Sequence, residues 1–190
     1  MRGEKTKILA VNPDPKYLGL AIFKDDELTY WGIKKLRSTG ITQAQLFSKV
    51  SQIVGTLIDE YKPDFMVMEE PTARRLKNSP ALKGMTVRIK ALGKRKIKRV
   101  YTFPALKVRK HLCQEEKPTK MNVERIIATK YYPWLYRRYA KDKQKDDRGQ
   151  WYKRKYHTCL FDAVALGIYG YQKLNKRLSW KYPSPPKSRD

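Results

Sequence analysis

The sequence predicts a mixed α/β fold with one central five-stranded sheet flanked by helices. Three short apolar runs open the chain and are separated by turn residues, which is typical of successive antiparallel strands. Further along, two more short apolar runs alternate with segments of helical periodicity. At 190 residues, with 41% hydrophobic residues, the chain is long enough to bury one core. We therefore expect a single domain over residues 1–178 and a loosely ordered tail over 179–190.

The elements are placed by their apolar spacing and by the residues that end them. The clearest helix has apolar side chains at Leu46, Val50 and Val54, and Pro63 ends it. The expected strands are residues 5–12, 17–24, 27–34, 65–68 and 98–103. The expected helices are residues 42–61, 79–93, 104–112, 119–131 and 157–174. Residues 136–156 form a basic, aromatic-rich segment without clear periodicity.

The charge of the chain indicates a polyanionic partner. There are 43 Lys and Arg residues against 18 Asp and Glu residues, which gives a formal net charge of +25. Nucleic acid is the first candidate, and an anionic membrane surface is the second. No apolar run approaches the roughly 18 residues that span a bilayer, and the first residues lack the apolar stretch of a secretory signal. We therefore expect neither membrane insertion nor export.

The cysteines and histidines favour a reducing compartment and do not predict zinc. Cys113 and Cys159 are far apart, so they do not form a disulfide framework. His111 and His157 add no metal-ligand spacing to them. We expect an intracellular location, in the cytoplasm or in the interior of an organelle or a virus-infected host cell.

Acidic side chains stand at three places with apolar surroundings. Glu69 and Glu70 close the strand 65–68, Asp162 lies in the apolar last helix, and Asn12 and Asp14 share the turn after the first strand. Burying a carboxylate is costly unless it is paired or holds a metal, and Mg²⁺ prefers carboxylate oxygens. Two such ions about 3.5–4 Å apart promote phosphodiester cleavage. Each place also has a plain structural explanation, as a helix start, a solvated strand end or a turn.

Four segments in chain order resemble one family. They read "ILAVNPDPKYLGLAIF", "DFMVMEEP", "VYTFPALKVRKHLCQEEKPTKMNV" and "CLFDAVALG", and they spread over residues 7–172. Together they resemble the RuvC-type Holliday junction resolvases, which have the RNase H-like nuclease fold. The resemblance implies a Mg²⁺-dependent endonuclease, with Mn²⁺ as a substitute, that resolves four-way DNA junctions in recombination and repair. It also implies a homodimer formed through the helix at 79–93.

The resemblance carries over to individual residues. The first catalytic Asp of the family falls on Asn12, the strand-end acid on Glu69, and a basic residue on Lys120. The two acids of the last helix fall on Cys159 and Asp162, so that two of the four family acids are replaced. The implied catalytic residues are Asn12, Glu69, Asp162 and Lys120, and the implied metal-binding residues are Asn12, Glu69, Glu70, Asp162 and Cys159. The aromatic wedge of the family is missing, because "PTARR" follows the strand-end acids.

Asn12 has three explanations, because an amide keeps the shape of a carboxylate but loses the charge that holds a divalent ion. The chain is a naturally inactive relative that keeps DNA binding, or Asp14 has taken over as ligand from a turn stiffened by prolines. Alternatively, Asn12 is a deliberate Asp-to-Asn change that traps an uncut complex, which the otherwise intact motif favours. We expect a resolvase inactivated at Asn12. The alternatives are a non-catalytic branched nucleic-acid-binding protein on a degenerate resolvase fold, and a nuclease for other branched DNA or RNA.

Basic side chains gather in two stretches, 88–99 and 136–156, and the second interleaves them with aromatic rings. Lys and Arg neutralise phosphates, and aromatic rings stack on unpaired bases. A solvated charged face explains the first stretch equally well. The candidate DNA-binding residues are Arg74, Arg75, Arg88, Lys94, Arg95, Lys96, Arg137, Arg138, Trp151, Lys153 and Arg154.

Overall fold

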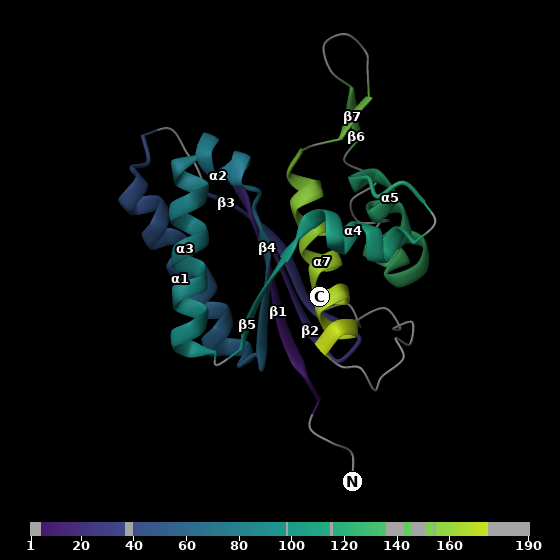
Figure 1. The fold of residues 1–190 in the computed structure, drawn as a ribbon, viewed down its shortest axis with the longest axis horizontal. Helices are drawn as coiled ribbons and strands as arrows, with labels where there is room; N and C mark the ends of the chain where they lie inside the picture. The colour runs from purple at the N-terminus through teal and green to yellow at the C-terminus, as the bar shows by residue number, and fades with distance from the viewer. Residues whose placement is uncertain are drawn as a thin grey trace.

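A five-stranded mixed sheet forms the centre of the molecule, with helices on both faces (Figure 1). The computed structural model describes residues 5–36, 40–97, 99–114, 116–135, 143–145, 151–153 and 155–174, with the backbone alone for 143–145, 151–153 and 155–157. The strands of the sheet are β1 (Lys7–Pro13), β2 (Tyr17–Lys24), β3 (Glu27–Lys35), β4 (Phe65–Glu70) and β5 (Val100–Pro104). Their order in the sheet is β3-β2-β1-β4-β5.

The strand directions bring two predicted site residues to one edge of the sheet. β1 pairs with β2 in antiparallel and with β4 in parallel register, and β4 pairs in parallel with β5. Val11 lies opposite Met68, so Asn12 and Glu69, one residue further on, end neighbouring parallel strands. The carboxyl ends of parallel strands lie at the same edge, which is where open α/β sheets place their sites.

Two apolar cores lie on the two faces of the sheet. On one face pack α1 (Gln43–Tyr61) and α3 (Pro80–Lys96), and on the other pack α7 (Lys155–Leu174), α4 (Ala105–Cys113) and α5 (Lys120–Ile126), as Figure 1 shows. Side chains alternate between faces along a strand. Leu9 and Val11 therefore enter the core under α1 and α3, whereas Ile8 and Ala10 enter the core under α7.

The mixed sheet flanked by helices is confirmed, with differences at the element ends. The fifth strand begins at Val100 rather than at residue 98, and the helix expected at 119–131 divides into α5 and the π-helical η1 (Ile127–Tyr131). The short helix α2 (Ala73–Asn78) was not expected, because it has no buried residues and therefore no apolar periodicity. The segment 136–156 contains a short antiparallel pair, β6 (Lys143–Lys145) and β7 (Trp151–Lys153). The expected tail lies outside the described residues.

Helix starts follow from local capping. Thr42 and Gln45 form a capping box at the start of α1, and the hydroxyls of Thr72 and Ser79 cap α2 and α3. Within the described part of the chain, no helix is both long enough and apolar enough to span a membrane.

Candidate active site

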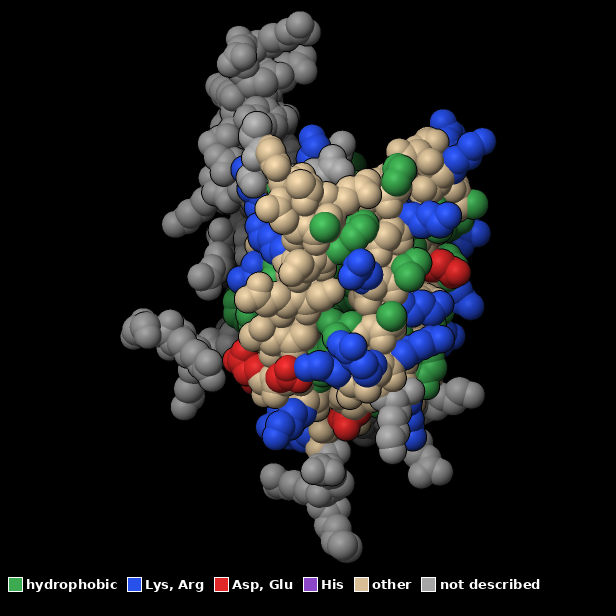
Figure 2. Space-filling model, turned by 90° about the vertical axis from the view of Figure 1, so that its left-hand side faces the viewer, with side chains coloured by type: hydrophobic (Ala, Val, Ile, Leu, Met, Phe, Trp, Pro, Cys, Tyr) green, Lys and Arg blue, Asp and Glu red, His purple; other side chains and the backbone are tan. Residues whose placement is uncertain are grey.

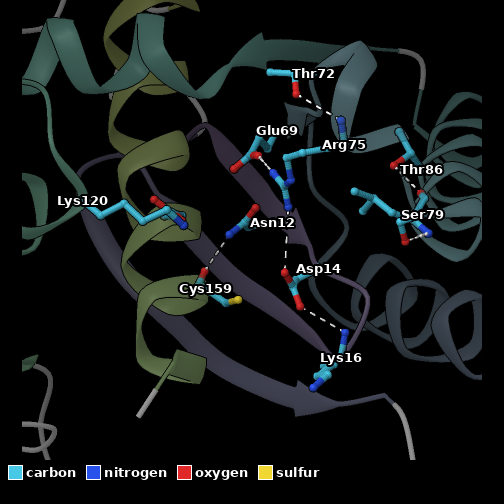
Figure 3. Close-up of polar contacts among 12 residues, drawn as sticks. Asn12, Asp14, Lys16, Glu69, Thr72, Arg75, Ser79, Thr86, Lys120 and Cys159 are labelled. Atoms are coloured by element: carbon cyan, nitrogen blue, oxygen red, sulfur yellow. Dashed lines mark hydrogen bonds and ion pairs between the residues drawn. The ribbon is translucent and has the colours of Figure 1, made fainter. Parts of the chain in front are cut away.

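Asn12 lies at the carboxyl end of β1 with its side chain on the face covered by α7, and it is only 3% exposed. Its Nδ2 donates to the carbonyl oxygen of Cys159 at 3.3 Å, which ties the end of β1 to the first turns of α7 (Figure 3). Its Oδ1 is buried and has no hydrogen-bond partner among the described residues. Because buried polar atoms are usually paired, Oδ1 is a candidate acceptor or ligand atom at the end of β1.

Gly19 allows this close approach of α7. It lies opposite Asn12 in the β1–β2 pair, and a Cβ built on it would stand 2.0 Å from the carbonyl oxygen of Cys159. Real Cβ atoms essentially never come that close to another heavy atom. A side chain at this position would therefore push α7 away from Asn12.

Glu69 is the second buried polar residue at this edge, on the same face of the sheet as Asn12 and 3% exposed. The Nη1 of Arg75 donates to its Oε1, and the Nη2 of Arg75 lies 3.8 Å from Oδ2 of Asp14. Figure 3 shows the guanidinium of Arg75 between the two carboxylates. Thr72, whose hydroxyl accepts from the backbone N–H of Arg75, starts the helix that presents this guanidinium. Arg75 thus pairs with both Glu69 and Asp14 and leaves one net negative charge among the three side chains.

The pKa of Glu69 lies above its ordinary value. Desolvation by burial is the main cause, and the negative charge of Asp162 adds to it. The positive charges of Arg75 and Lys120 act in the opposite direction. Glu69 and Asp162 are therefore close enough to repel each other electrostatically, as two carboxylates of one site do.

Asp162 projects from α7 and is 7% exposed. The Nζ of Lys120, at the start of α5, donates to its Oδ2 at 2.6 Å, and the Nη2 of Arg109 on α4 lies 4.0 Å from its Oδ1. The Nε of Arg109 is buried without a partner in the described structure. Arg109 was not expected from the sequence, where it is one of several basic residues in an amphipathic helix.

Several of these side chains, Asn12, Glu69, Arg75 and Lys120 among them, line a cavity of about 260 Å³. Asp162 does not line it and reaches it through Lys120. The cavity is open, charged and placed where the ends of β1 and β4 meet α7 (Figure 3). Its lining residues are Asn12, Asp14, Pro15, Lys16, Tyr17, Glu69, Arg75, Lys120, Thr158 and Cys159.

Cys159 and Glu70, two of the expected metal-binding residues, do not place a carboxylate in the cavity. Cys159 is 5% exposed, and burial raises the pKa of its thiol to about 12, so the sulfur is a neutral thiol at neutral pH. Glu70 is exposed, because it follows Glu69 on the strand and so points to the opposite face of the sheet. Neither supplies a buried carboxylate to the cavity.

The oxygen donors for a metal are fewer than the four acids that the resemblance implies. Glu69 and Asp162 carry two negative charges, and Asn12 offers a neutral amide oxygen without a partner among the described residues. Two divalent ions would bring four positive charges to a site that also contains Arg75 and Lys120. No group of three or more His, Cys, Asp or Glu side chains that could hold a metal occurs in the described part of the chain.

The expected DNA-binding residues fall into separate places. Arg74 is exposed on α2, beside the cavity residue Arg75. The guanidinium of Arg88 lies 4.9 Å from the centre of the Phe47 ring, and Lys96 pairs with Asp59. Lys94, Arg95 and Lys96 form the last turn of α3, which leads to the start of β5 and thus to the opposite edge of the sheet. The side chains of Arg137, Arg138, Trp151, Lys153 and Arg154 lie outside the described residues.

Comparison with solved structures identifies the fold. RuvC of Thermus thermophilus superposes with a TM-score of 0.62 at 12% identity, over 90% of this chain and 97% of that chain. The same protein in complex with Holliday junction substrate gives 0.62 and 13%, over 90% and 96%. The yeast mitochondrial Holliday junction resolvase Ydc2 gives 0.62 and 11%, over 90% and 81%. The chain therefore has the RuvC-type resolvase fold. No protein-family model and no curated protein sequence matches it.

Proposed function

We propose that this chain is a structure-specific, Mg²⁺-dependent endonuclease for four-way DNA junctions whose cleavage is suppressed by Asn12. One observation carries the proposal. A buried amide oxygen, unpartnered among the described residues, stands at the end of the central strand beside the buried carboxylate of Glu69. An Asp at this position would have the same shape and would add the negative charge that a cation site needs. The net charge of +25 and the fold shared with two resolvases support DNA as the substrate.

In this proposal Glu69, Asp162 and the oxygen of residue 12 hold the ion. When bound, the ion lowers the pKa of a water molecule and stabilises the negative charge on the leaving oxygen. The reaction joins the water oxygen to phosphorus and breaks the bond to the 3′ oxygen, which leaves 5′-phosphate and 3′-hydroxyl ends. Lys120, 49% exposed at the cavity rim, is placed to donate to a phosphate oxygen as charge develops. Mn²⁺ is expected to replace Mg²⁺.

Asn12 suppresses cleavage because it lacks the negative charge of an Asp. The two side chains have the same shape, so the charge is the difference that matters. With the amide in place, only two carboxylates attract the metal ion. The ion has to compete for them with Arg75 and Lys120, which already pair with Glu69 and Asp162. Asn12→Asp restores a third negative charge inside the cavity without adding volume. The substitution removes the hydrogen bond from Nδ2 to the Cys159 carbonyl, because a carboxylate oxygen cannot donate, and it keeps the Oδ1 position, which no described residue occupies, for the ion.

The test compares cleavage of a four-way DNA junction by this chain and by Asn12→Asp, with Mg²⁺ present. Asn78→Asp is the matched control, because it adds the same charge at an exposed position on α2. We expect nicks at symmetric positions from Asn12→Asp alone. A panel of three-way junctions, linear duplex and branched RNA then defines the substrate class.

A second function is favoured by the ion pairs of the cavity. Glu69 and Asp162 already have cationic partners, and Asn12 and Cys159 are neutral, which suits a site that binds phosphate without cutting it. If both this chain and its Asn12→Asp variant bind the junction tightly and neither cleaves it, the non-catalytic role is established.

We also propose a homodimer, since paired cuts across a four-way junction need two copies of one site. The exposed face of α3, where Val87 is 61% exposed, is the proposed contact. Sedimentation of the full chain is expected to give twice the mass of 22.4 kDa. A single-chain mass in both the presence and the absence of junction DNA would contradict the dimer.

A further inference from the structure

A second concave surface lies at the edge of the sheet opposite the candidate active site. Its residues come from the starts of β1 and β4, the end of β2, the end of α1 and the residue before β5, whereas Asn12 and Glu69 lie near the other ends of β1 and β4. The cavity has a volume of about 700 Å³. We call it the distal basic cavity, and it is lined by Lys5, Thr6, Lys7, Lys24, Lys62, Asp64, Phe65 and Arg99.

The distal basic cavity carries an excess of positive charge. Five of its eight lining residues are Lys or Arg, and Asp64 is the one acid among them. Asp64 has a structural task, since its carboxylate accepts from the backbone N–H of Lys7 at 2.8 Å and its own N–H donates to the carbonyl of Lys7 at 2.9 Å. No ion pair among the described residues includes any of the five basic side chains, whereas Arg75 and Lys120 at the other edge are both paired.

Local contacts position three of the basic residues that line the cavity. Lys62 ends α1 with φ 48° in the left-handed region, and its N–H donates to the carbonyl of Ile58 at 2.9 Å, which directs the residue away from the helix. The guanidinium of Arg99 lies 5.2 Å from the centre of the Phe65 ring, within the range of a cation–π contact. Lys7 is fixed through its backbone by Asp64. The backbone of Lys7 and Lys62 and the guanidinium of Arg99 are therefore positioned at the cavity by contacts within the chain.

Converging like charges repel, so their grouping in one hollow calls for an anionic ligand. The charged lining distinguishes the cavity from the mostly apolar pockets that bind small organic molecules. Phosphate groups in series match it best, because a single phosphate would leave most of the five cations unneutralised. On a chain of net charge +25, such a series is most simply the backbone of a nucleic acid.

We propose that the distal basic cavity binds the phosphate backbone of a second DNA segment, an arm of the branched substrate away from the cutting point. The proposal rests on the proposed function for its DNA ligand but does not depend on cleavage. β1 separates the two sites, and the six steps from Lys7 to Pro13 at about 3.3 Å each give roughly 20 Å. With one phosphate per 3.4 Å along each strand, the contact falls about six base pairs from the branch point.

The test measures junction affinity by fluorescence anisotropy as a function of salt. The variant is Lys62→Gln/Arg99→Gln, and the matched control is Lys107→Gln/Lys110→Gln, which removes the same charge from exposed positions on α4, away from the distal basic cavity, the basic stretches and the proposed dimer contact. Each neutralised phosphate contributes about 0.9 to the slope of log affinity against log salt, so the variant should lower the slope by about 1.8. The loss should appear with arms of about 12 base pairs and vanish with arms of about 4 base pairs, which do not reach the cavity.

Each outcome is decisive. An unchanged slope in the variant, or an equal loss with both arm lengths, overturns the proposal. A further outcome is that the variant loses the binding of inorganic tripolyphosphate, measured by calorimetry, while the salt slope of its junction affinity stays unchanged. That result assigns the cavity to a free polyphosphate and overturns the DNA ligand. Circular dichroism melting of the variants confirms that they fold. If Asn12→Asp fails to cut but the slope effect holds, the cavity assignment stands and only the nuclease proposal falls.

Discussion

The contact between β2 and α7 at Gly19 gives a quantitative prediction for Gly19→Ala. The new Cβ would stand 2.0 Å from the carbonyl oxygen of Cys159, and ordinary contacts begin at 3.4 Å. The first turns of α7 must therefore move by about 1.4 Å, the difference between these two distances. Asn12 lies directly opposite Gly19, and its hydrogen bond to the same carbonyl is already 3.3 Å long. The movement breaks that bond and carries Asp162 away from Glu69.

The cost has two parts. Overpacking of a tight contact destabilises by about 1–3 kcal/mol, and the lost hydrogen bond adds about 1 kcal/mol. The sum of about 2–4 kcal/mol corresponds to a fall in Tm of roughly 4–16 °C for a domain of this size. The same substitution in open surroundings should behave differently. At Gly55 in α1 the new Cβ meets Leu92 at 3.9 Å, so Gly55→Ala is expected to stabilise by up to about 1 kcal/mol through helix propensity.

The assay is thermal melting followed by circular dichroism, with the parent chain and both variants under one buffer condition. We predict a large fall in Tm for Gly19→Ala and an equal or higher Tm for Gly55→Ala. If Gly19→Ala melts together with Gly55→Ala, then α7 does not pack against β2 as described, and the anchoring of Asn12 by α7 is refuted.

Three further predictions concern the buried groups of the candidate site. Arg75→Gln leaves the carboxylate of Glu69 buried without its partner and should lower the free energy of unfolding in urea by about 1–3 kcal/mol. Arg74→Gln, at the exposed neighbouring position, should leave that free energy unchanged. Equal losses in the two variants would contradict the ion pair. Burial raises the pKa of Glu69, so the folded state binds its proton more tightly than the unfolded state, and this contribution to stability is present at low pH and lost as the pH rises through the raised pKa. Glu69→Gln should therefore flatten the fall of Tm between acidic and neutral pH, and an unchanged pH profile would refute the buried carboxylate. Burial also raises the pKa of Cys159 to about 12, so its thiol should resist alkylation at pH 8 until the chain is unfolded. Mass spectrometry of the alkylated protein measures this. Rapid labelling of Cys159 in the native chain would contradict the buried thiol.

The strands and the site residues at their ends could be predicted because they leave regular signals in the sequence. Apolar runs give the five strands, and a polar residue that ends such a run, as Asn12 and Glu69 do, belongs to the edge of the sheet. Cys159 and Asp162 are three residues apart on one helix and therefore share a face. The cavity brings Asn12, Glu69, Cys159 and Lys120 together, in agreement with the resemblance of the motifs.

The partners of these residues could not be predicted, because they depend on tertiary placement. Arg75 was expected to touch DNA, and its pairing with Glu69 was not predicted, since the short helix that presents it has no apolar pattern to reveal it. Arg109 and Lys120 reach Asp162 from two helices whose relative positions no local spacing encodes. The distal basic cavity gathers residues from four strand ends and from the end of α1, so its charge is dispersed along the sequence.

The central claim is that Asn12 occupies a ligand position of a divalent cation site and lacks only the charge. Calorimetric titration of Mg²⁺ into this chain and into Asn12→Asp tests it most directly. The account predicts at least about tenfold tighter binding to Asn12→Asp, with one ion per chain, because the side chain of residue 12 lines the cavity beside Glu69. Equal Mg²⁺ affinity for the two chains would contradict it and would leave Asn12 as a structural link between β1 and α7.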